Sequence, residues 1–329
     1  MSNILNSILL ILLISGTFLA ASSSNIFSAW MGLEINLMSF IPLMHNENSI
    51  LSNESMMKYF LIQTVGSISF LFSTLIHSNM NLFFLETQAI NFLIIMALML
   101  KLGAAPFHQW MINVVEGLSW TLNFLLVSWQ KIAPLLIMTS FIMMVPPLLY
   151  LFMVASAIIG SIGGLSHSSF KKIMAYSSIN HLAWLFMSFS LPEWILWNYF
   201  LIYCLINFTI MFMFETYNVS YINQVMMFFS LKTKFFLFIP LLSLGGLPPL
   251  TGFFSKWIII ISAIYKSMTL VLILIFSSFI SLFYYLQISF SSILSVNYSN
   301  KYMIINSSFN LLMILLFLST FGLPLFILV

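Results

Sequence analysis

The sequence is a succession of apolar stretches, each roughly 20 residues long, separated by short polar connections. Because an α-helix rises about 1.5 Å per residue, such a stretch crosses the roughly 30 Å hydrocarbon core of a bilayer. The pattern predicts an all-α polytopic membrane protein with about eleven transmembrane helices and no separate soluble domain. The predicted spans are residues 3–21, 25–44, 56–77, 82–118, 121–143, 146–165, 169–189, 194–216, 235–264, 267–288 and 306–328.

Two of these spans are interrupted by glycine and proline. In the fourth, KLGAAPFHQW places Gly103 and Pro106 directly after an apolar run, and in the ninth, SLGGLPPLTGFFSKW carries two glycines followed by two prolines. Proline removes a backbone donor, and unpaired backbone within a membrane is tolerated only against protein or a wet cavity. Each break therefore predicts local hydration, although a simple proline kink that serves packing is the alternative.

The places of the two breaks suggest an internal repeat. They fall in the fourth and the ninth predicted helix, which hold the same position in two successive groups of five. Because five is odd, the second group would be inverted across the membrane relative to the first, as in many ion-coupled transporters. We expect two inverted five-helix repeats, over residues 1–143 and 146–288, and a final helix over 306–328.

Composition narrows the possible functions. Hydrophobic residues make up 61% of the chain and charged residues 5%, and arginine and aspartate do not occur. A basic face for nucleic acid is thereby excluded, and no glycine-rich phosphate-binding motif is present. The single Cys204 excludes a disulfide, a redox pair or a cysteine-ligated cluster within the chain, and we expect it to be a buried packing residue. The five histidines lack the spacing of a helical metal site.

The positions of the charges predict the orientation. When residues within about a turn of the membrane edge are counted, one set of alternate connections carries only Lys266 and the other set carries six lysines. The positive-inside rule therefore places that second set and the amino terminus on the matrix or cytoplasmic side. The amino-terminal stretch contains neither lysine nor arginine, so we expect it to be the first membrane helix. The six lysines are Lys58, Lys171, Lys172, Lys232, Lys234 and Lys301.

Four charged residues fall near the bilayer centre of predicted helices and are the candidates for function: Glu34, Lys101, Lys131 and Lys256. A charge at the bilayer centre costs about 2.5–3.5 kcal/mol on insertion scales, and such residues commonly mark ion pathways. Lysines near helix ends, such as Lys58 and Lys266, are instead expected to reach the interface. Lys101 and Lys256 adjoin the two breaks, where hydration would allow a proton to hop.

Other polar residues have weaker claims. Glu116 follows the first break and is expected either to extend the path or to face the interface. For His181 we favour a hydrogen-bonded packing role over membership of a water chain. The hydroxyls of Ser177 and Ser178 are expected to bond the preceding turn or a neighbouring helix. The carboxylates near helix ends are expected to be interfacial: Glu86, Glu193 and Glu215.

Four motifs occur in a characteristic order: KLGAAPFHQW, WQKIAPL, FKKIMAYSSINHLAW and LGGLPPLTGFFSKW. In this order and spacing they resemble NADH dehydrogenase subunit 2 of mitochondrial respiratory complex I, an antiporter-like membrane subunit. The resemblance runs from about Trp30 to Trp257. Two departures are visible: Ala183 stands where the family usually has glycine, and no proline follows Trp110 within three residues, where the family often has one.

The resemblance implies a proton-translocating subunit of NADH:ubiquinone oxidoreductase, in the mitochondrial inner membrane with its amino terminus on the matrix side. It implies that Glu34 is the carboxylate paired with Lys101, that Lys131 is the connecting lysine and that Lys256 is the terminal lysine of a lateral path. The chain itself would bind no cofactor or metal, with NADH, FMN, iron–sulfur clusters and ubiquinone held by other subunits. Its partners would be the other membrane and peripheral subunits and lipids, and no nucleic acid.

The chemistry of lysine agrees with such a role. Burial lowers the pKa of a lysine and a nearby carboxylate raises it, so moving the partner charge loads or releases a proton, whereas arginine would stay charged. A free-standing cation/proton antiporter is the alternative, since it would share the inverted repeat. A third interpretation is a scaffold in which the buried ion pair only fixes helix packing.

Overall fold

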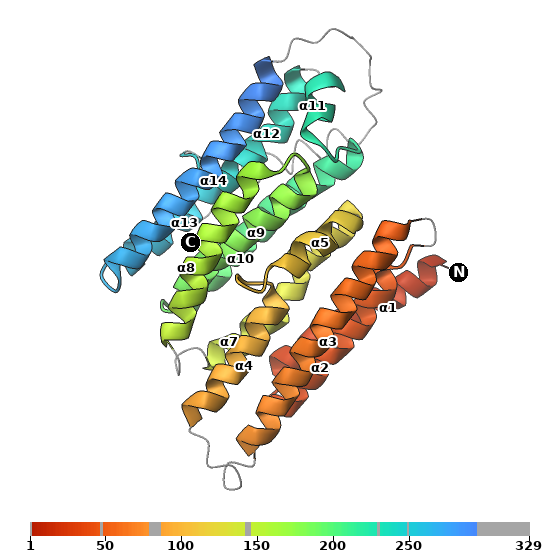
Figure 1. Cartoon of the computed structure of the whole chain (residues 1–329), viewed down its shortest axis with the longest axis vertical. Coiled ribbons are helices and arrows are strands. Elements are labelled where there is room, and N and C mark those ends of the chain that lie inside the picture. The colour runs from red at the N-terminus through yellow and green to blue at the C-terminus, as the bar shows by residue number, and fades with distance from the viewer. Residues whose placement is uncertain are drawn as a thin grey trace. The chain divides into compact units, whose positions relative to one another are not determined.

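The computed structural model describes residues 2–46, 49–78, 87–141, 146–228, 231–248 and 250–294. Within these ranges the chain is almost entirely helical (Figure 1), and seven helices are long and apolar enough to cross a membrane. Three shorter apolar helices flank the predicted breaks: Gln88–Leu102, Lys234–Gly245 and Thr251–Ala263. The predicted final helix, 306–328, lies outside the described residues. The predicted helical membrane class is confirmed for the described part of the chain.

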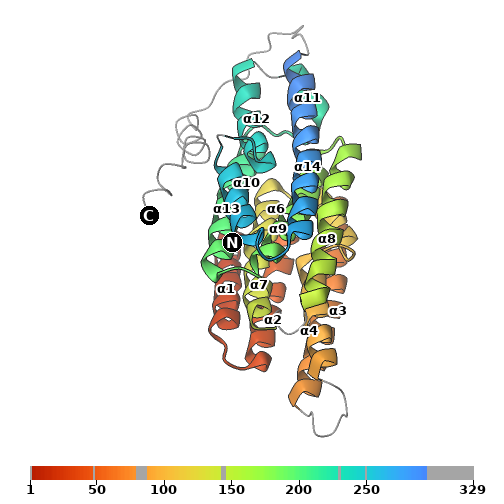
Figure 2. The ribbon, with the colours of Figure 1, turned by 90° about the vertical axis from the view of Figure 1, so that its left-hand side faces the viewer.

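The chain divides into two compact units, residues 1–152 and 153–329. In the first unit, α1 packs on α2, α2 on α3, and α3 on both α4 and α5. Figure 2 shows α1 and α2 as neighbours joined by a short connection. The helices are α1 (Ser2–Ser22), α2 (Ile26–Met44), α3 (Ile50–Ser78), α4 (Thr87–Leu102), α5 (Gln109–Gly117), α6 (Trp120–Val127), α7 (Trp129–Phe141) and α8 (Pro146–Gly163), which continues into the second unit.

Glycine allows α1 and α2 to approach closely. A Cβ atom at Gly32 would lie 2.5 Å from the backbone nitrogen of Ala20, and one at Gly16 would lie 2.9 Å from the backbone nitrogen of Asn36. Small residues at helix contacts are the usual means of close packing in membranes. This packing fixes α2, which carries Glu34 and Asn36, against its neighbour.

The second unit is organised around α9 (Phe170–Ser188), in which every residue from Ser177 to Ser188 is buried. Three helices, α10, α13 and α14, pack against it, and α14 also lies alongside α12 (Figure 1). The remaining elements are the short 3₁₀ helix η2 (Gly164–Ser166), α10 (Glu193–Thr216), α11 (Ile222–Phe228), α12 (Leu231–Gly245), α13 (Thr251–Ala263) and α14 (Met268–Leu294). A helix with no exposed face over most of its length can carry functional groups away from lipid and solvent.

Both predicted breaks are confirmed, and the structure adds a third interruption. α4 ends at Leu102 and α12 at Gly245, in each case next to the glycines that the sequence singles out. The span predicted over 121–143 is present, but it divides at Ser128 into α6 and α7, which was not predicted. The Ser128 hydroxyl donates to the carbonyl of Phe124 (2.5 Å), and Pro134 brings no backbone donor to the next turn. The two pieces still form one apolar span, Trp120–Phe141.

Two helical segments replace predicted connections. α3 begins at Ile50 and so absorbs part of a polar stretch that we predicted to be a loop. Its first turn is supported by the Ser52 hydroxyl, which donates to the Ser49 carbonyl (2.8 Å). α11 was not predicted, and the side-chain oxygen of Gln224 accepts from the backbone nitrogens of Ser220 (2.7 Å) and Tyr221 (3.1 Å) at its start. The Gln224 contacts cap the start of α11 and so offset its weak apolar pattern.

Large apolar side chains are exposed along the outer faces of long helices. They lie on α1, α3 and α14, and examples are Ile4, Phe18, Leu61, Ile68, Phe276 and Phe279. A surface of this kind is unfavourable in water but suits contact with lipid tails or with other apolar helices.

Candidate functional site

The break between α4 and α5 is held by side-chain donors from two helices. Gly103 adopts φ +70°, a conformation that favours glycine. The Trp110 indole nitrogen donates to the carbonyl of Leu100 (3.2 Å), and the Gln63 amide nitrogen donates to the carbonyl of Lys101 (3.2 Å). Carbonyls at the end of the broken helix therefore find new partners within the protein. The break is therefore stabilised by specific side-chain contacts and is not a simple proline kink.

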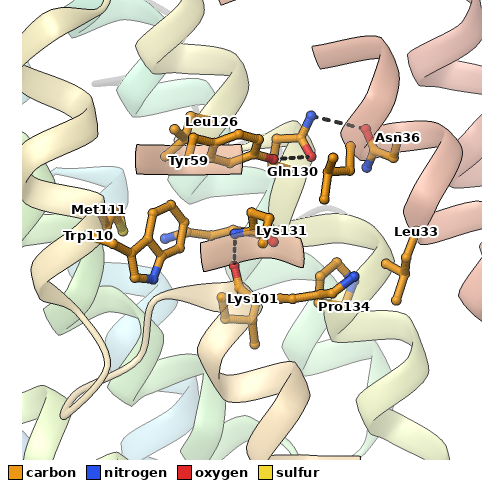
Figure 3. A pocket seen from close by; sticks show the side chains of 13 residues that line it. Leu33, Asn36, Tyr59, Lys101, Trp110, Met111, Leu126, Gln130, Lys131 and Pro134 are labelled. Atoms are coloured by element: carbon orange, nitrogen blue, oxygen red, sulfur yellow. Dashed lines mark hydrogen bonds between the residues drawn. The ribbon is translucent and has the colours of Figure 1, made fainter. Parts of the chain in front are cut away.

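A small cavity lies beside this break and contains two of the predicted lysines (Figure 3). Lys101 from α4 is 7% exposed and Lys131 from α7 is 3% exposed. The cavity offers about 20 Å³ to the centre of a water molecule, and about 10–15 Å³ on this measure holds one water. Its walls are formed by Leu33, Asn36, Leu37, Tyr59, Gln63, Lys101, Leu102, Trp110, Met111, Leu126, Gln130, Lys131 and Pro134.

Neutral polar groups connect three helices at the cavity wall. The Tyr59 hydroxyl on α3 donates to the Gln130 side-chain oxygen on α7 (3.5 Å), and the Gln130 amide donates to the Asn36 side-chain oxygen on α2 (3.0 Å), as Figure 3 shows. These hydrogen-bonded residues were not predicted, because neutral polar residues do not stand out against an apolar background as charges do. The adjacency of Gln130 to Lys131 was the available signal.

Glu34 lies on α2 and is half-buried. It is near enough for its charge to act on Lys101, but it does not line the cavity, and the described residues contain no direct ion pair between the two side chains. An ion pair in the described part of the chain joins Glu54 and Lys58 on the exposed face of α3 (3.6 Å). The pairing of Glu34 with Lys101 stays a prediction.

The second break carries Lys256, which is 5% exposed. Its ammonium group on α13 donates to the carbonyls of Leu244 (3.0 Å) and Gly245 (2.9 Å) at the end of α12. A positive charge is favourable there, since the carboxyl end of a helix carries partial negative charge. These carbonyls are bound by the lysine itself, where the sequence led us to expect water. The ammonium also lies 5.9 Å from the ring centre of Trp184 on α9 and so faces the core of the second unit.

The chain matches a known family over the region that contains these features. The family described as NADH:quinone oxidoreductase/Mrp antiporter, TM, matches residues 23–281, which include both breaks and Lys101, Lys131 and Lys256. Two relatives named NADH-ubiquinone oxidoreductase chain 2 are each 40% identical to it. The one from Locusta migratoria covers 94% of this chain and 93% of its own length, and the one from Anopheles gambiae covers 94% and 92%.

The chain belongs to the NADH-ubiquinone oxidoreductase chain 2 family. The resemblance proposed from its four motifs is confirmed.

Solved structures share the fold of this family member. A chain of respiratory complex I from Thermus thermophilus superposes with a TM-score of 0.80 at 20% identity, over 95% of this chain and 75% of that one. A chain of the Mrp complex from Dietzia sp. gives a TM-score of 0.75 at 14% identity, over 91% and 61%. At these identities the likeness concerns the fold, which complex I and the Mrp complex have in common.

Within the family fold, the weaker candidates take definite positions. The Ser177 hydroxyl donates to the carbonyl of Met174 and the Ser178 hydroxyl to that of Ala175, each at 2.7 Å, which confirms the predicted bonds to the preceding turn. His181 is buried and its Nδ1 lies 2.6 Å from the Tyr199 hydroxyl.

The described acidic candidates that remain lie near helix ends. Glu116 is exposed in the last turn of α5, and Glu193 and Glu215 stand at the two ends of α10. Glu86 lies outside the described residues. Cys204 is half-buried, so the expectation of a buried packing residue is wrong in part.

The prediction that Lys234 lies in a connection between helices is wrong, because the residue belongs to α12. It is fully buried within α12, and its ammonium donates to the carbonyl of Ser292 near the end of α14 (2.7 Å). This side chain therefore links α12 to α14. Its positive charge is favourable there, because the carboxyl end of a helix carries partial negative charge. Lys266, by contrast, is exposed as expected, and its ammonium contacts the carbonyl of Ser190.

Proposed function

We propose that this chain is a proton-translocating membrane subunit of NADH:ubiquinone oxidoreductase. Protons would move through buried lysines, Glu34 and ordered water, and redox chemistry in other subunits would supply the free energy. The observation that carries the proposal is the cavity that holds Lys101 and Lys131 beside a broken helix, in a chain of this family. Buried lysines at such a place are costly to insert and serve no evident packing purpose.

The cavity has the properties that proton exchange between two amines requires. It has room for about one water, which can bridge polar groups that are too far apart for a direct hydrogen bond. Two ammonium groups in one buried cavity repel each other strongly, because screening there is weak. We infer that Lys101 and Lys131 carry a proton alternately, and that a change in the charge near Glu34 decides which of them holds it.

Lys256 is the third proton-carrying group of the proposal. It binds the free carbonyls of α12 when it is charged, and a neutral amine would bind them less tightly, since hydrogen bonds from a charged donor are about twice as strong as neutral ones. Loss of its proton therefore weakens the contact between α12 and α13. In this way proton release at Lys256 is coupled to the geometry of the second break.

The finer features of the sequence analysis form part of the same proposal. We propose eleven membrane helices in two inverted repeats, residues 1–143 and 146–288, followed by a helix over 306–328. The membrane would be the mitochondrial inner membrane, with the amino terminus in the matrix. The chain would hold no redox centre, and other membrane and peripheral subunits would carry the cofactors.

Replacement of Lys101 by methionine tests the proposal, because methionine keeps the length of the apolar stem and removes the exchangeable proton. In the intact complex, reconstituted into vesicles, we expect protons moved per NADH oxidised to fall severalfold. Lys58→Met is the matched control, since Lys58 is exposed and paired on the surface of α3, and it should pump normally. An unchanged proton-to-NADH ratio in the Lys101→Met complex would refute the assignment.

Relatives named NADH-ubiquinone oxidoreductase chain 2 support the subunit over the alternative from the sequence, a free-standing antiporter. The alternative predicts that the purified chain alone exchanges a cation for protons across a vesicle membrane. The subunit assignment predicts no such exchange by the chain alone, and transport only in the assembled complex during NADH oxidation.

A further inference from the structure

Lys131 stands in the first turn of α7, directly after the interruption at Ser128. The first turn of a helix lacks the backbone hydrogen bonds that hold later turns in place. The backbone nitrogen of Lys131 bonds only as far back as the carbonyl of Ser128 (3.2 Å), which is itself part of the interruption. The position of the Lys131 ammonium in the cavity therefore depends on contacts that tie this turn to other helices.

Gln130, the residue before Lys131, supplies such a contact. Its amide nitrogen donates to the side-chain oxygen of Asn36 on α2 at 3.0 Å, an ordinary hydrogen-bond length (Figure 3). Asn36 is 3% exposed, so solvent does not compete for its side chain. One hydrogen bond thus fixes the start of α7 against α2.

Tyr59 of α3 favours one orientation of the Gln130 amide. Its hydroxyl lies 3.5 Å from the Gln130 side-chain oxygen, a longer and weaker contact than the bond to α2. Its buried ring contacts the ring of Phe40 on α2 (5.3 Å between ring centres) and that of Trp110 on α5 (5.9 Å). A hydroxyl that faces the amide oxygen leaves the amide nitrogen directed toward Asn36.

The bond reaches α2 close to Glu34. Asn36 follows Glu34 by two residues, and Gln130 directly precedes Lys131. A displacement of this part of α2 therefore moves the first turn of α7 with it. Neither amide gains or loses a proton as the lysines do, so the link persists whichever lysine carries the charge.

We propose that Gln130 is a positioning residue that couples the place of Lys131 to that of α2 through its bond to Asn36. A shift of α2 around Glu34 then changes the separation of Lys131 from Lys101. Proton exchange between two groups is sensitive to such a change, since a misplacement of about 1 Å can cost about 100-fold in rate. The inference rests on the proposed function and deepens it, because it names neutral residues that control the site.

Removal of the bond from either side is the direct test. Gln130→Leu and Asn36→Leu each put an apolar side chain of similar size in place of an amide. In the intact complex in vesicles, we expect each to lower the protons moved per NADH severalfold. The double variant should pump about as well as either single one, because the same bond is lost only once, whereas two independent structural defects would multiply their effects.

An exchanged pair of amides separates positioning from general damage. Asn36→Gln combined with Gln130→Asn moves the longer side chain to α2 and keeps the total length of the bridge. It should pump better than Gln130→Asn alone, in which the two amides no longer reach each other. The control is Gln88→Leu, the same chemical change as Gln130→Leu at an exposed glutamine of α4, and it should pump as the unaltered complex does.

Three outcomes would overturn the coupling. They are multiplied losses in the double leucine variant, an exchanged pair no better than Gln130→Asn alone, and normal transport in both single leucine variants when Lys131→Met has lost transport. Normal transport in Lys131→Met would instead overturn the proposed function. If the leucine variants fail to assemble, the exchanged pair decides the question, since it keeps both amides.

Discussion

The second break tolerates no side chain at Gly252. A Cβ atom there would overlap the carbonyl oxygen of Ser243 and would lie 2.7 Å from its carbonyl carbon. Both groups belong to backbone, so relief requires that the end of α12 and the start of α13 move apart. Lys256 lies one turn further along α13, and its hydrogen bonds to Leu244 and Gly245 are already 3.0 and 2.9 Å long. A separation of about 1 Å stretches both beyond hydrogen-bonding distance.

The expected cost of Gly252→Ala follows from these two effects. Overpacking of a closed site costs about 1–3 kcal/mol, and each hydrogen bond from a charged group is worth about 1.5–3 kcal/mol. We therefore expect Gly252→Ala to destabilise the second unit by about 4 kcal/mol or more. Gly245→Ala is the matched control at the same break, because its added Cβ would meet the Tyr285 ring at 3.3 Å, which a small shift of the ring accommodates.

Three quantities are measured: the yield of assembled complex, its unfolding temperature in detergent, and proton transport by the fraction that assembles. Gly252→Ala should lower all three, whereas Gly245→Ala should remain close to the unaltered protein. If Gly252→Ala assembles, unfolds and pumps as Gly245→Ala does, the close contact between α12 and α13 does not hold Lys256 in place, and the coupling inferred for this break is wrong.

Two further substitutions test the contacts of single side chains. Gln63→Leu leaves the carbonyl of Lys101 without its side-chain donor, which should cost about 1–3 kcal/mol of stability. The expected result is faster amide hydrogen exchange around the first break. Gln109→Leu, at an exposed glutamine on the other side of the break, should leave the exchange unchanged. Lys234→Met removes the hydrogen bond that joins α12 to α14, worth about 1.5–3 kcal/mol, and should speed exchange in the last turn of α14. Equal exchange in substituted and unaltered chains would contradict either contact.

The sequence predicted the helices and both breaks because each depends on local chemistry. Apolar length sets a membrane span, and Gly103 and Gly246 occupy positive-φ positions that few other residues tolerate. The third interruption, at Ser128, had no comparable signal in the sequence, because a serine hydroxyl that bonds the carbonyl four residues back, as Ser128 does, leaves many helices undivided. α11 was not predicted, because it is supported by the capping contacts of Gln224 and its sequence has only a weak apolar pattern.

The lysines were found from sequence because charge is rare in this chain, but their partners were not. Lys101 and Lys131 share a cavity, Lys256 binds a helix end and Lys234 joins two helices. One residue type thus serves different purposes, and only the backbone around each decides which. Lys234 illustrates the difficulty, since its position in the sequence resembles that of an interfacial lysine, whereas its side chain is fully buried.

The three lysines of the proposed path all lie near an interruption of a helix. Lys101 directly precedes the last residue of α4, Lys131 follows the division at Ser128, and Lys256 lies in the second turn of α13. An unbroken helix satisfies its own carbonyls and offers an ammonium group nothing to bind, whereas a broken one exposes carbonyls and makes room for water. Breaks therefore lower the cost of burying a charge, and they also allow that charge to be gained and lost. The same local geometry accounts for both the insertion of these lysines and their proposed use.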